Sequence, residues 1–221
     1  MASNVRINGF RVWGTMSGGE GVIPGALVRP VANNYATQIN KGDLIIPVSD
    51  GTVAQAATNS TTLLGVVTGC SFVSATPPTA GKRVVSDFIP ANTTFTPTTV
   101  GSPNESLVQY VPLTGEVILE VDLSGTTVNT VAGRVGLIGE NCAYTTNGTA
   151  STVVGYSVMC LDDSSHVTTA QQFRIVGLPG YSLEGGLDLS QAGSGDATVA
   201  GFKVLVVCNQ GFLPPFTTSG V

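Results

Sequence analysis

The chain has 221 residues, of which 42% are hydrophobic and only 10% are charged, and its formal net charge is −5. This composition excludes a disordered tail, which combines low hydrophobicity with high charge, and a coiled coil, which needs charged residues at heptad spacing. Its nine lysines and arginines are scattered, so we expect no nucleic-acid partner, because phosphate binding needs clustered basic residues. We also expect cytoplasmic synthesis and no membrane partner, since neither a signal-peptide core nor an apolar run of roughly 20 residues is found.

The sequence predicts an all-β fold built from antiparallel sandwich-like or barrel-like units. Val and Thr, which favour pleated strands, are frequent, and no window longer than about ten residues shows the apolar spacing of a helix. Short strands separated by turns are typical of sandwiches and barrels. In chain order, the expected strands cover residues 5–13, 26–31, 44–48, 52–56, 63–68, 83–88, 107–111, 116–123, 143–146, 149–154, 153–161, 173–176 and 199–207.

Glycine and proline divide the chain into four expected parts. Because proline cannot donate to a central ladder, the Pro/Thr-rich part is expected to hold only one edge strand, at 83–88. The four parts are an N-terminal arm (1–20), a β-barrel-like lobe (21–73), a Pro/Thr-rich extended connection (74–104) and a C-terminal β lobe with an apolar tail (105–221).

Two dipeptides predict tight turns. Asp50-Gly51 and Asn147-Gly148 each separate two apolar runs, which is the pattern of a two-residue hairpin turn. A faint similarity between residues 58–67 and 146–156 leaves two interpretations open: two related β lobes that arose by duplication, or chance resemblance in a Thr-rich chain.

The strand expected at 116–123 alternates strictly between an apolar and an acidic face. It follows the strand at 107–111 across a short turn, so we expect the two strands to form a hairpin. The acidic face carries Glu116, Glu120 and Asp122. We interpret it as the water-facing side of a half-buried strand, with a contact patch for a basic partner as the alternative.

No residue pattern predicts catalysis, so we expect no enzyme, no catalytic residue and no cofactor. His166 is the only histidine, and no serine lies in the strained turn motif of the serine hydrolases. Asp162 and Asp163 shortly precede His166 in a polar run. We interpret this run as a solvated turn, with a weak cation site as the alternative.

The four cysteines lie far apart and lack the paired spacing of a zinc site, so we expect no metal centre. Each lies in or beside an apolar segment, which favours buried free thiols, with disulfides as the alternative. They are Cys70, Cys142, Cys160 and Cys208.

The low charge favours a chain whose surface is covered by neighbouring molecules, since soluble domains usually carry about 25% charged residues. The apolar C-terminal tail is expected to dock, either on the chain's own body or on a neighbour. The side chains that we expect to contact a partner are Phe10, Trp13, Phe212, Leu213 and Phe216.

Four segments share an ordered pattern of glycine, aspartate and apolar residues. They are Gly25-Ala26-Leu27-Val28-Arg29-Pro30, Lys41-Gly42-Asp43-Leu44-Ile45-Ile46, Asp50-Gly51-Thr52-Val53-Ala54-Gln55-Ala56 and Leu64-Gly65-Val66-Val67-Thr68-Gly69. The pattern resembles the capsid decoration (cement) proteins of tailed bacteriophages over about residues 20–70, with a looser similarity at 131–160. The resemblance implies a structural virion protein on the capsid exterior that stabilises contacts between major capsid subunits. The implied partners are the major capsid protein and further copies of this chain, as a dimer or trimer.

Two other kinds of virion protein stay open as alternatives. One is a receptor- or glycan-binding β module, although the sequence does not group the aromatic residues of a sugar site. The other is a different structural component of the head or tail.

Overall fold

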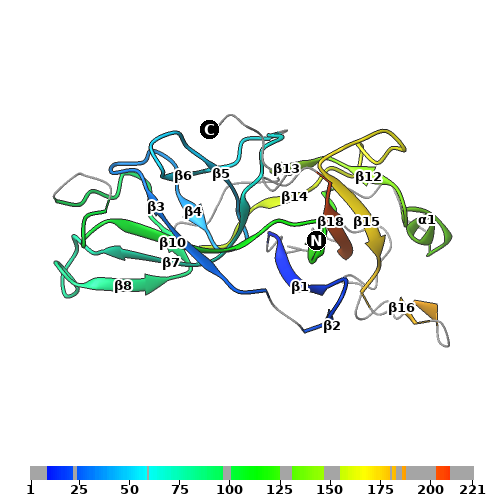
Figure 1. Ribbon diagram of the computed structural model, residues 1–221, viewed down its shortest axis with the longest axis horizontal. Helices are drawn as coiled ribbons and strands as arrows, with labels where there is room; N and C mark the ends of the chain where they lie inside the picture. Colours follow the sequence, from blue (N-terminus) through cyan, green and yellow to red (C-terminus); the bar gives the residue numbers. More distant parts are fainter. Residues whose placement is uncertain are drawn as a thin grey trace, which may run out of the picture.

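The computed structural model describes residues 9–21, 24–58, 60–96, 101–124, 131–146, 155–179, 181–182, 186–187 and 203–209. Over these residues the protein is all-β, with almost every strand pair antiparallel, so the expected fold class is confirmed. Figure 1 shows two lobes side by side, a closed barrel and an open sheet. The one helix of the described part, α1 (Val131–Gly136), lies at the outer edge of the open-sheet lobe.

Five strands close the barrel in the order β10-β3-β6-β5-β7, and β7 pairs with β10 to complete the ring. Their neighbours are antiparallel except for β3 and β6, which meet in parallel at Val31 and Val53. The five strands are β3 (Leu27–Val31), β5 (Leu44–Pro47), β6 (Val53–Gln55), β7 (Gly65–Val73) and β10 (Ser106–Pro112). Two short strands, β4 (Ile39–Asn40) and β9 (Phe88–Ile89), pair with each other beside β7.

The open sheet takes strands from both ends of the chain, in the order β12-β15-β18-β11-β1-β2. Its strands are β1 (Arg11–Thr15), β2 (Gly19–Glu20), β11 (Val117–Asp122), β12 (Asn141–Cys142), β15 (Phe173–Gly177) and β18 (Lys203–Cys208). Two further pairs lie outside both sheets. They are β13 (Tyr144–Thr146) with β14 (Met159–Leu161), and β16 (Tyr181–Ser182) with β17 (Gly186–Leu187).

Two hydrophobic cores follow from the alternation of side chains along the barrel strands. Ile45, Val67 and Val108 belong to the core inside the barrel. Their neighbours Leu44 and Val66 belong instead to the second core, which the barrel shares with the open sheet. The barrel strands are therefore buried on both faces where the two lobes meet.

Polar contacts also join the lobes. The Tyr144 hydroxyl donates to the carbonyl of Ala57 and accepts from the backbone N–H of Ser60 at 3.1 Å. The backbone N–H of Phe10 donates to the carbonyl of Gly42 at 2.9 Å. Because these bonds accompany a continuous apolar core, the two lobes pack as one body.

Local features of the sequence are confirmed. Strands β5 and β6 pair across Asp50-Gly51, where Gly51 has a positive φ of 86°. Strand β8 (Arg83–Ser86) pairs only with β7 among the described strands, as expected for an edge strand in the connection. The Asn147-Gly148 turn and the strand expected at 149–154 lie outside the described residues, and among the described strands β13 pairs with β14.

Several long-range expectations are wrong. Strands β10 and β11 form no hairpin, because β10 closes the barrel and β11 pairs with β1 and β18 in the other sheet. The barrel therefore includes residues beyond the expected boundary at 105. Residues 11–15 are not part of an arm, because β1 is an interior strand between β11 and β2. The described strands of the two lobes differ in order, and most of the similar segment at 146–156 lies outside the described residues.

Gly9 offers a test of the packing between the lobes. It has a φ of +71°, and an added Cβ would lie 2.4 Å from Cβ of Ser157 and 2.7 Å from the carbonyl oxygen of Gly42. We expect Gly9→Ala to lower the free energy of unfolding by about 2 kcal/mol or more, from strain and overpacking together. Urea unfolding measures this, with Gly115→Ala as the control, because Gly115 has open space around it. Equal stability of the two variants would contradict the close contact of Gly9 with Ser157 and Gly42.

Candidate functional site

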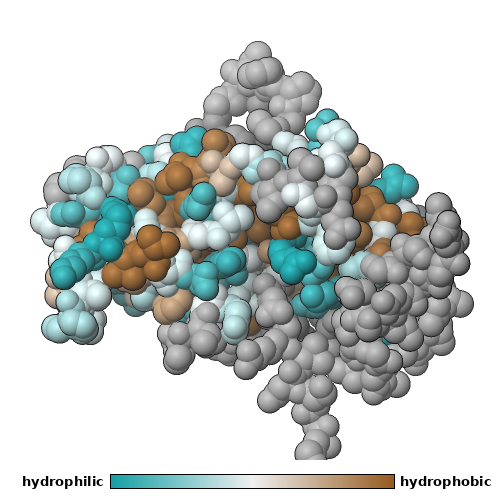
Figure 2. Space-filling view, turned by 90° about the horizontal axis from the view of Figure 1, so that it is seen from below, coloured by the Kyte–Doolittle hydropathy of each residue, from teal (hydrophilic) through white to brown (hydrophobic). Residues whose placement is uncertain are grey.

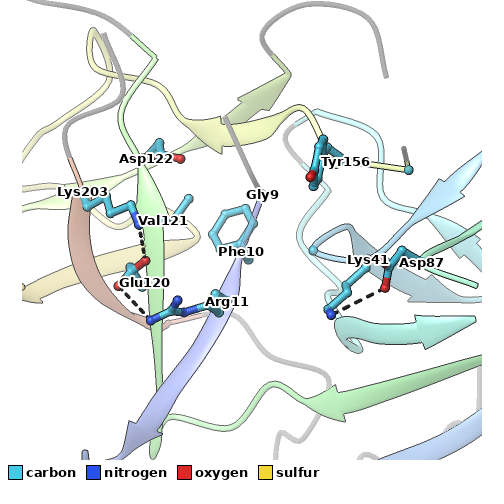
Figure 3. Close-up of a pocket in the computed structure, with 12 residues that line it drawn as sticks. Gly9, Phe10, Arg11, Lys41, Asp87, Glu120, Val121, Asp122, Tyr156 and Lys203 are labelled. Carbon is cyan, nitrogen blue, oxygen red and sulfur yellow. Dashed lines mark hydrogen bonds and ion pairs between the residues drawn. The ribbon is translucent and has the colours of Figure 1, made fainter. Parts of the chain in front are cut away.

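A cleft of about 260 Å³ lies where the two lobes meet. One wall comes from β1, β11 and β18 of the open sheet, and the other from Lys41, Asp87 and Tyr156. Figure 3 shows the ring of Phe10 between these two walls. The cleft thus brings together side chains that lie far apart in the sequence, and both lobes are needed to form it.

Glu120 is the central charge of the open-sheet wall. Its side chain is only 7% exposed, and its carboxylate accepts from Lys203 Nζ at 2.7 Å and from Arg11 Nη2 at 3.4 Å. Lys203 is largely covered, whereas the Arg11 side chain is 67% exposed. The two cations compensate this carboxylate for the water that it has lost on burial.

The acidic stripe is therefore not a water-facing surface. Glu116 is exposed as expected, but Glu120 and Asp122 are buried. The expectation failed because β11 is an interior strand, with β1 on one side and β18 on the other. The neighbouring strands supply basic side chains that cover the acidic face, so its basic partner belongs to the same chain.

The barrel wall carries a weaker ion pair. Lys41 Nζ lies 3.5 Å from an Asp87 carboxylate oxygen, and the two side chains are 57% and 62% exposed. Exposed pairs of this kind contribute little to stability, because water screens them. Tyr156, on the same wall, is the one aromatic side chain among the large exposed hydrophobic residues of the described part.

Asp43 lies in a polar cluster beside the cleft and is fully buried. Its Oδ2 accepts from the backbone N–H of Asn40 at 2.7 Å and from Nε2 of Gln55 at 2.7 Å. Burial raises the pKa of the Asp43 carboxyl above its ordinary value of 3.8, and donors from Ser157, Asn40 and Gln55 oppose that shift without cancelling it.

A second surface lies on the barrel, away from the cleft. Val85 on β8, Leu107 on β10 and Pro30 on β3 stand in one row across the sheet, with Ser71 of β7 between them. This row and the adjacent Val28 point away from the barrel core, and we call Val28, Pro30, Leu107 and Val85 the outer barrel face. Val85 is 84% and Val28 57% exposed. Figure 2 shows patches of apolar side chains over the barrel lobe, with polar side chains between them.

The expected partner contacts have different outcomes. Phe10 is wrong as a contact residue, because it is buried in the shared core and stacks on Phe173 with ring centroids 4.9 Å apart. Trp13 is half-buried, with the Arg11 guanidinium 5.9 Å from its ring centroid. The other three, Phe212, Leu213 and Phe216, lie outside the described residues.

The run that contains Asp162 and Asp163 forms a turn as expected, but it is not solvated throughout, because Asp163 is buried. The Asp162 carboxylate accepts from the backbone N–H and hydroxyl of Ser164 at 3.0 and 2.7 Å. His166 contacts Glu140 instead, at 2.9 Å. Across the described ranges, no group of three or more His, Cys, Asp or Glu side chains is placed to hold a metal ion, so the alternative of a cation site gains no support.

All four cysteines are free and buried, which confirms the expectation. Burial raises the pKa of the thiols of Cys70 and Cys160 to about 12 and that of Cys142 to about 11. Thiols with such pKa values stay protonated at neutral pH and are poor nucleophiles.

Comparison with known proteins gives no relative for this chain: no family model matches it, and neither the curated proteins nor the solved structures contain a match. Within the described residues, no helix is long and apolar enough to cross a membrane.

Sequence reasoning missed the cleft residues Arg11, Lys41 and Lys203. Hydrogen bonds join Arg11 and Lys203 to Glu120 across 109 and 83 residues of sequence. No local sequence pattern predicts pairing over such a distance. The one available signal was the strict alternation of the strand at 116–123, which placed Glu120 and Asp122 on one face without revealing what would cover it.

Glu120→Ala tests the buried ion pair. The substitution leaves Lys203 without its acceptor in a largely covered position, so we expect the free energy of unfolding to fall by about 1–3 kcal/mol. Chemical denaturation measures the loss. Glu116→Ala, at the exposed start of the same acidic face, should change stability by less than about 0.5 kcal/mol. A variant Glu120→Ala as stable as Glu116→Ala would show that the pair contributes nothing.

Asp43→Asn tests the raised pKa through its pH dependence. The folded state holds the Asp43 proton more tightly than the unfolded chain does, so wild-type stability falls as pH rises above 3.8 and through the higher folded pKa. Asn has no proton to lose and can keep its oxygen at the Oδ2 position. The wild-type unfolding free energy, measured relative to Asp43→Asn, should therefore decrease with rising pH and then become constant.

Asp50→Asn is the matched control for this titration. Asp50 is exposed, and hydrogen bonds from Thr52 hold the pKa of its carboxyl below the ordinary value. The wild type, measured relative to Asp50→Asn, should therefore gain stability as pH rises, which is the opposite direction. The same direction for both variants would refute the raised pKa of Asp43.

Proposed function

We propose that this protein is a structural virion component that binds the outer surface of an assembled phage capsid and stabilises contacts between major capsid subunits. The observation that carries the proposal is the outer barrel face, where exposed Val28 on β3 and Val85 on β8 flank the half-buried Pro30 and Leu107. Contiguous apolar patches on soluble proteins commonly mark sites of protein association. The resemblance of residues 20–70 to the decoration proteins supplies the kind of partner.

The apolar side chains of the outer barrel face suit a protein contact. Ser71 lies at its centre, and the side chain of Gln109 on β10 lies beside Gly69 of β7. The Arg83 side chain beside this face donates to Ser71 Oγ at 3.1 Å and to the carbonyls of Pro103 and Glu105 at 2.8 and 2.9 Å.

A protein of this kind acts without chemistry. If it binds the assembled shell and not the free subunits, mass action stabilises the shell by the free energy of binding at each site. When the same modest contact repeats at many equivalent positions, the total stabilisation of the shell becomes large. The shared apolar core of the two lobes and the exposed side chains of the outer barrel face support this proposal.

The experiment is sedimentation of the purified chain with tailed-phage heads, followed by a count of bound copies per particle. We expect wild type to reach a saturating copy number. The double variant Val28→Glu/Val85→Glu should lose binding by at least about tenfold, because docking would bury two carboxylates without partners. Both residues are exposed, so the variant should fold normally.

Met16→Glu is the matched control, since Met16 is 61% exposed and lies on the turn after β1 in the other lobe. It should bind shells as wild type does. Failure of the wild type to bind any head or empty shell would refute the proposed function. Equal binding by wild type and the double variant would refute the outer barrel face as the contact.

A further inference from the structure

We propose that the cleft between the lobes is a binding site for a single carboxylate on a short aliphatic stem, held between Arg11 and Lys41. This inference is independent of the proposed function, because it rests on the chemistry of the cleft and not on the outer barrel face. The carboxylate has two sources, a free small acid or an acidic side chain of a neighbouring protein.

The size of the cleft limits what it holds. Sites for cofactors and larger metabolites usually measure about 300–1,000 Å³. At about 260 Å³ the cleft is smaller than this range, and it is partly open to solvent. It therefore suits one small group or one inserted side chain. Its place between two lobes is a common location for ligand sites.

Hydrogen-bonding capacity in the cleft favours an acceptor as the ligand. Arg11 has five N–H donors, and within the described residues only Nη2 has an acceptor, the distant oxygen of Glu120. Lys41 has three donors and one long contact with Asp87. On the acidic side, both oxygens of Glu120 are already engaged by Lys203 and Arg11. A ligand rich in acceptors satisfies the remaining donors.

The charges in the cleft favour one negative charge over two. Three cations line it, Arg11, Lys41 and Lys203. Three carboxylates line it as well, Asp87, Glu120 and Asp122. A phosphate dianion would place two charges among these carboxylates and meet repulsion from each. A single carboxylate can accept from Arg11 in a bidentate manner and adds only one negative charge to the cleft.

Apolar groups in the cleft favour an aliphatic stem. Phe10 and Val121 line it between the charged walls. Figure 3 shows Arg11 and Lys41 on opposite walls, both below the Phe10 ring in that view. A ligand that places its carboxylate between the two cations therefore directs its stem toward this ring. A short methylene chain removes apolar surface from water there.

The test is an NMR titration of the full chain with sodium butyrate at constant ionic strength, with sodium phosphate and butylammonium chloride in parallel. We expect butyrate to shift the amide signals of Phe10, Arg11, Gly42 and Val121 saturably, with a dissociation constant of roughly 1 mM. Phosphate should bind more weakly, and butylammonium should give no saturable shift. Tighter binding of phosphate or butylammonium than of butyrate would overturn the proposal.

Single substitutions locate the site. Arg11→Gln and Lys41→Gln should each weaken butyrate binding by roughly tenfold, since each removes a charged hydrogen-bond donor. Both side chains are mostly exposed, so both variants should fold. Arg174→Gln and Lys82→Gln replace exposed cations outside the cleft and should leave binding unchanged. Unaltered binding in both cleft variants would overturn the assignment.

Butyrate saturation during the sedimentation experiment distinguishes the two sources of carboxylate. If a shell side chain occupies the cleft, butyrate and Lys41→Gln should both reduce the number of bound copies. If the ligand is a free acid, both should leave decoration unchanged. The butyrate titration tests the cleft whichever source is found, and it does so even if the chain binds no shell.

Discussion

The fold depends on barrel strands that are buried on both faces where the lobes meet. Ile45 and Val67 fill the barrel, while the adjacent Leu44 and Val66 fill the core shared with the open sheet. A slip of one residue in the register would exchange the two sets, and each core would receive side chains shaped for the other. Both cores therefore fix the register of the same barrel strands. This is why two lobes of different topology pack as one body.

The same arrangement explains where the charges are. In a chain with so few ionisable side chains, several acids are buried near the junction, and Glu120 is held there by cations from β1 and β18. Charges used inside the molecule are absent from its surface. The four side chains of the outer barrel face are apolar, and Arg83 lies beside them. Burial of charge at the junction and exposure of apolar groups elsewhere are two results of one composition.

The sequence predicted what is encoded locally. The Asp50-Gly51 turn, the edge strand at 83–86 and the all-β class all follow from residue types and spacing within short windows. Phe10 shows why the rest did not follow. It precedes a strand near the start of the chain, where exposure is common, yet it stacks on a residue more than 160 positions away. Pairing over such distances leaves no local pattern, so the arm, the hairpin and the acidic stripe were all misinterpreted.

The cleft and the outer barrel face are separable parts of the molecule. The outer barrel face belongs to one lobe and needs only the barrel to be closed. The cleft needs both lobes, because Arg11 comes from the open sheet and Lys41 from the segment that leads into β5. A ligand that contacts both residues therefore binds only when the lobes are packed, and it must stabilise that packing by mass action. Docking through the barrel alone carries no such requirement, so occupancy of one surface need not alter the other.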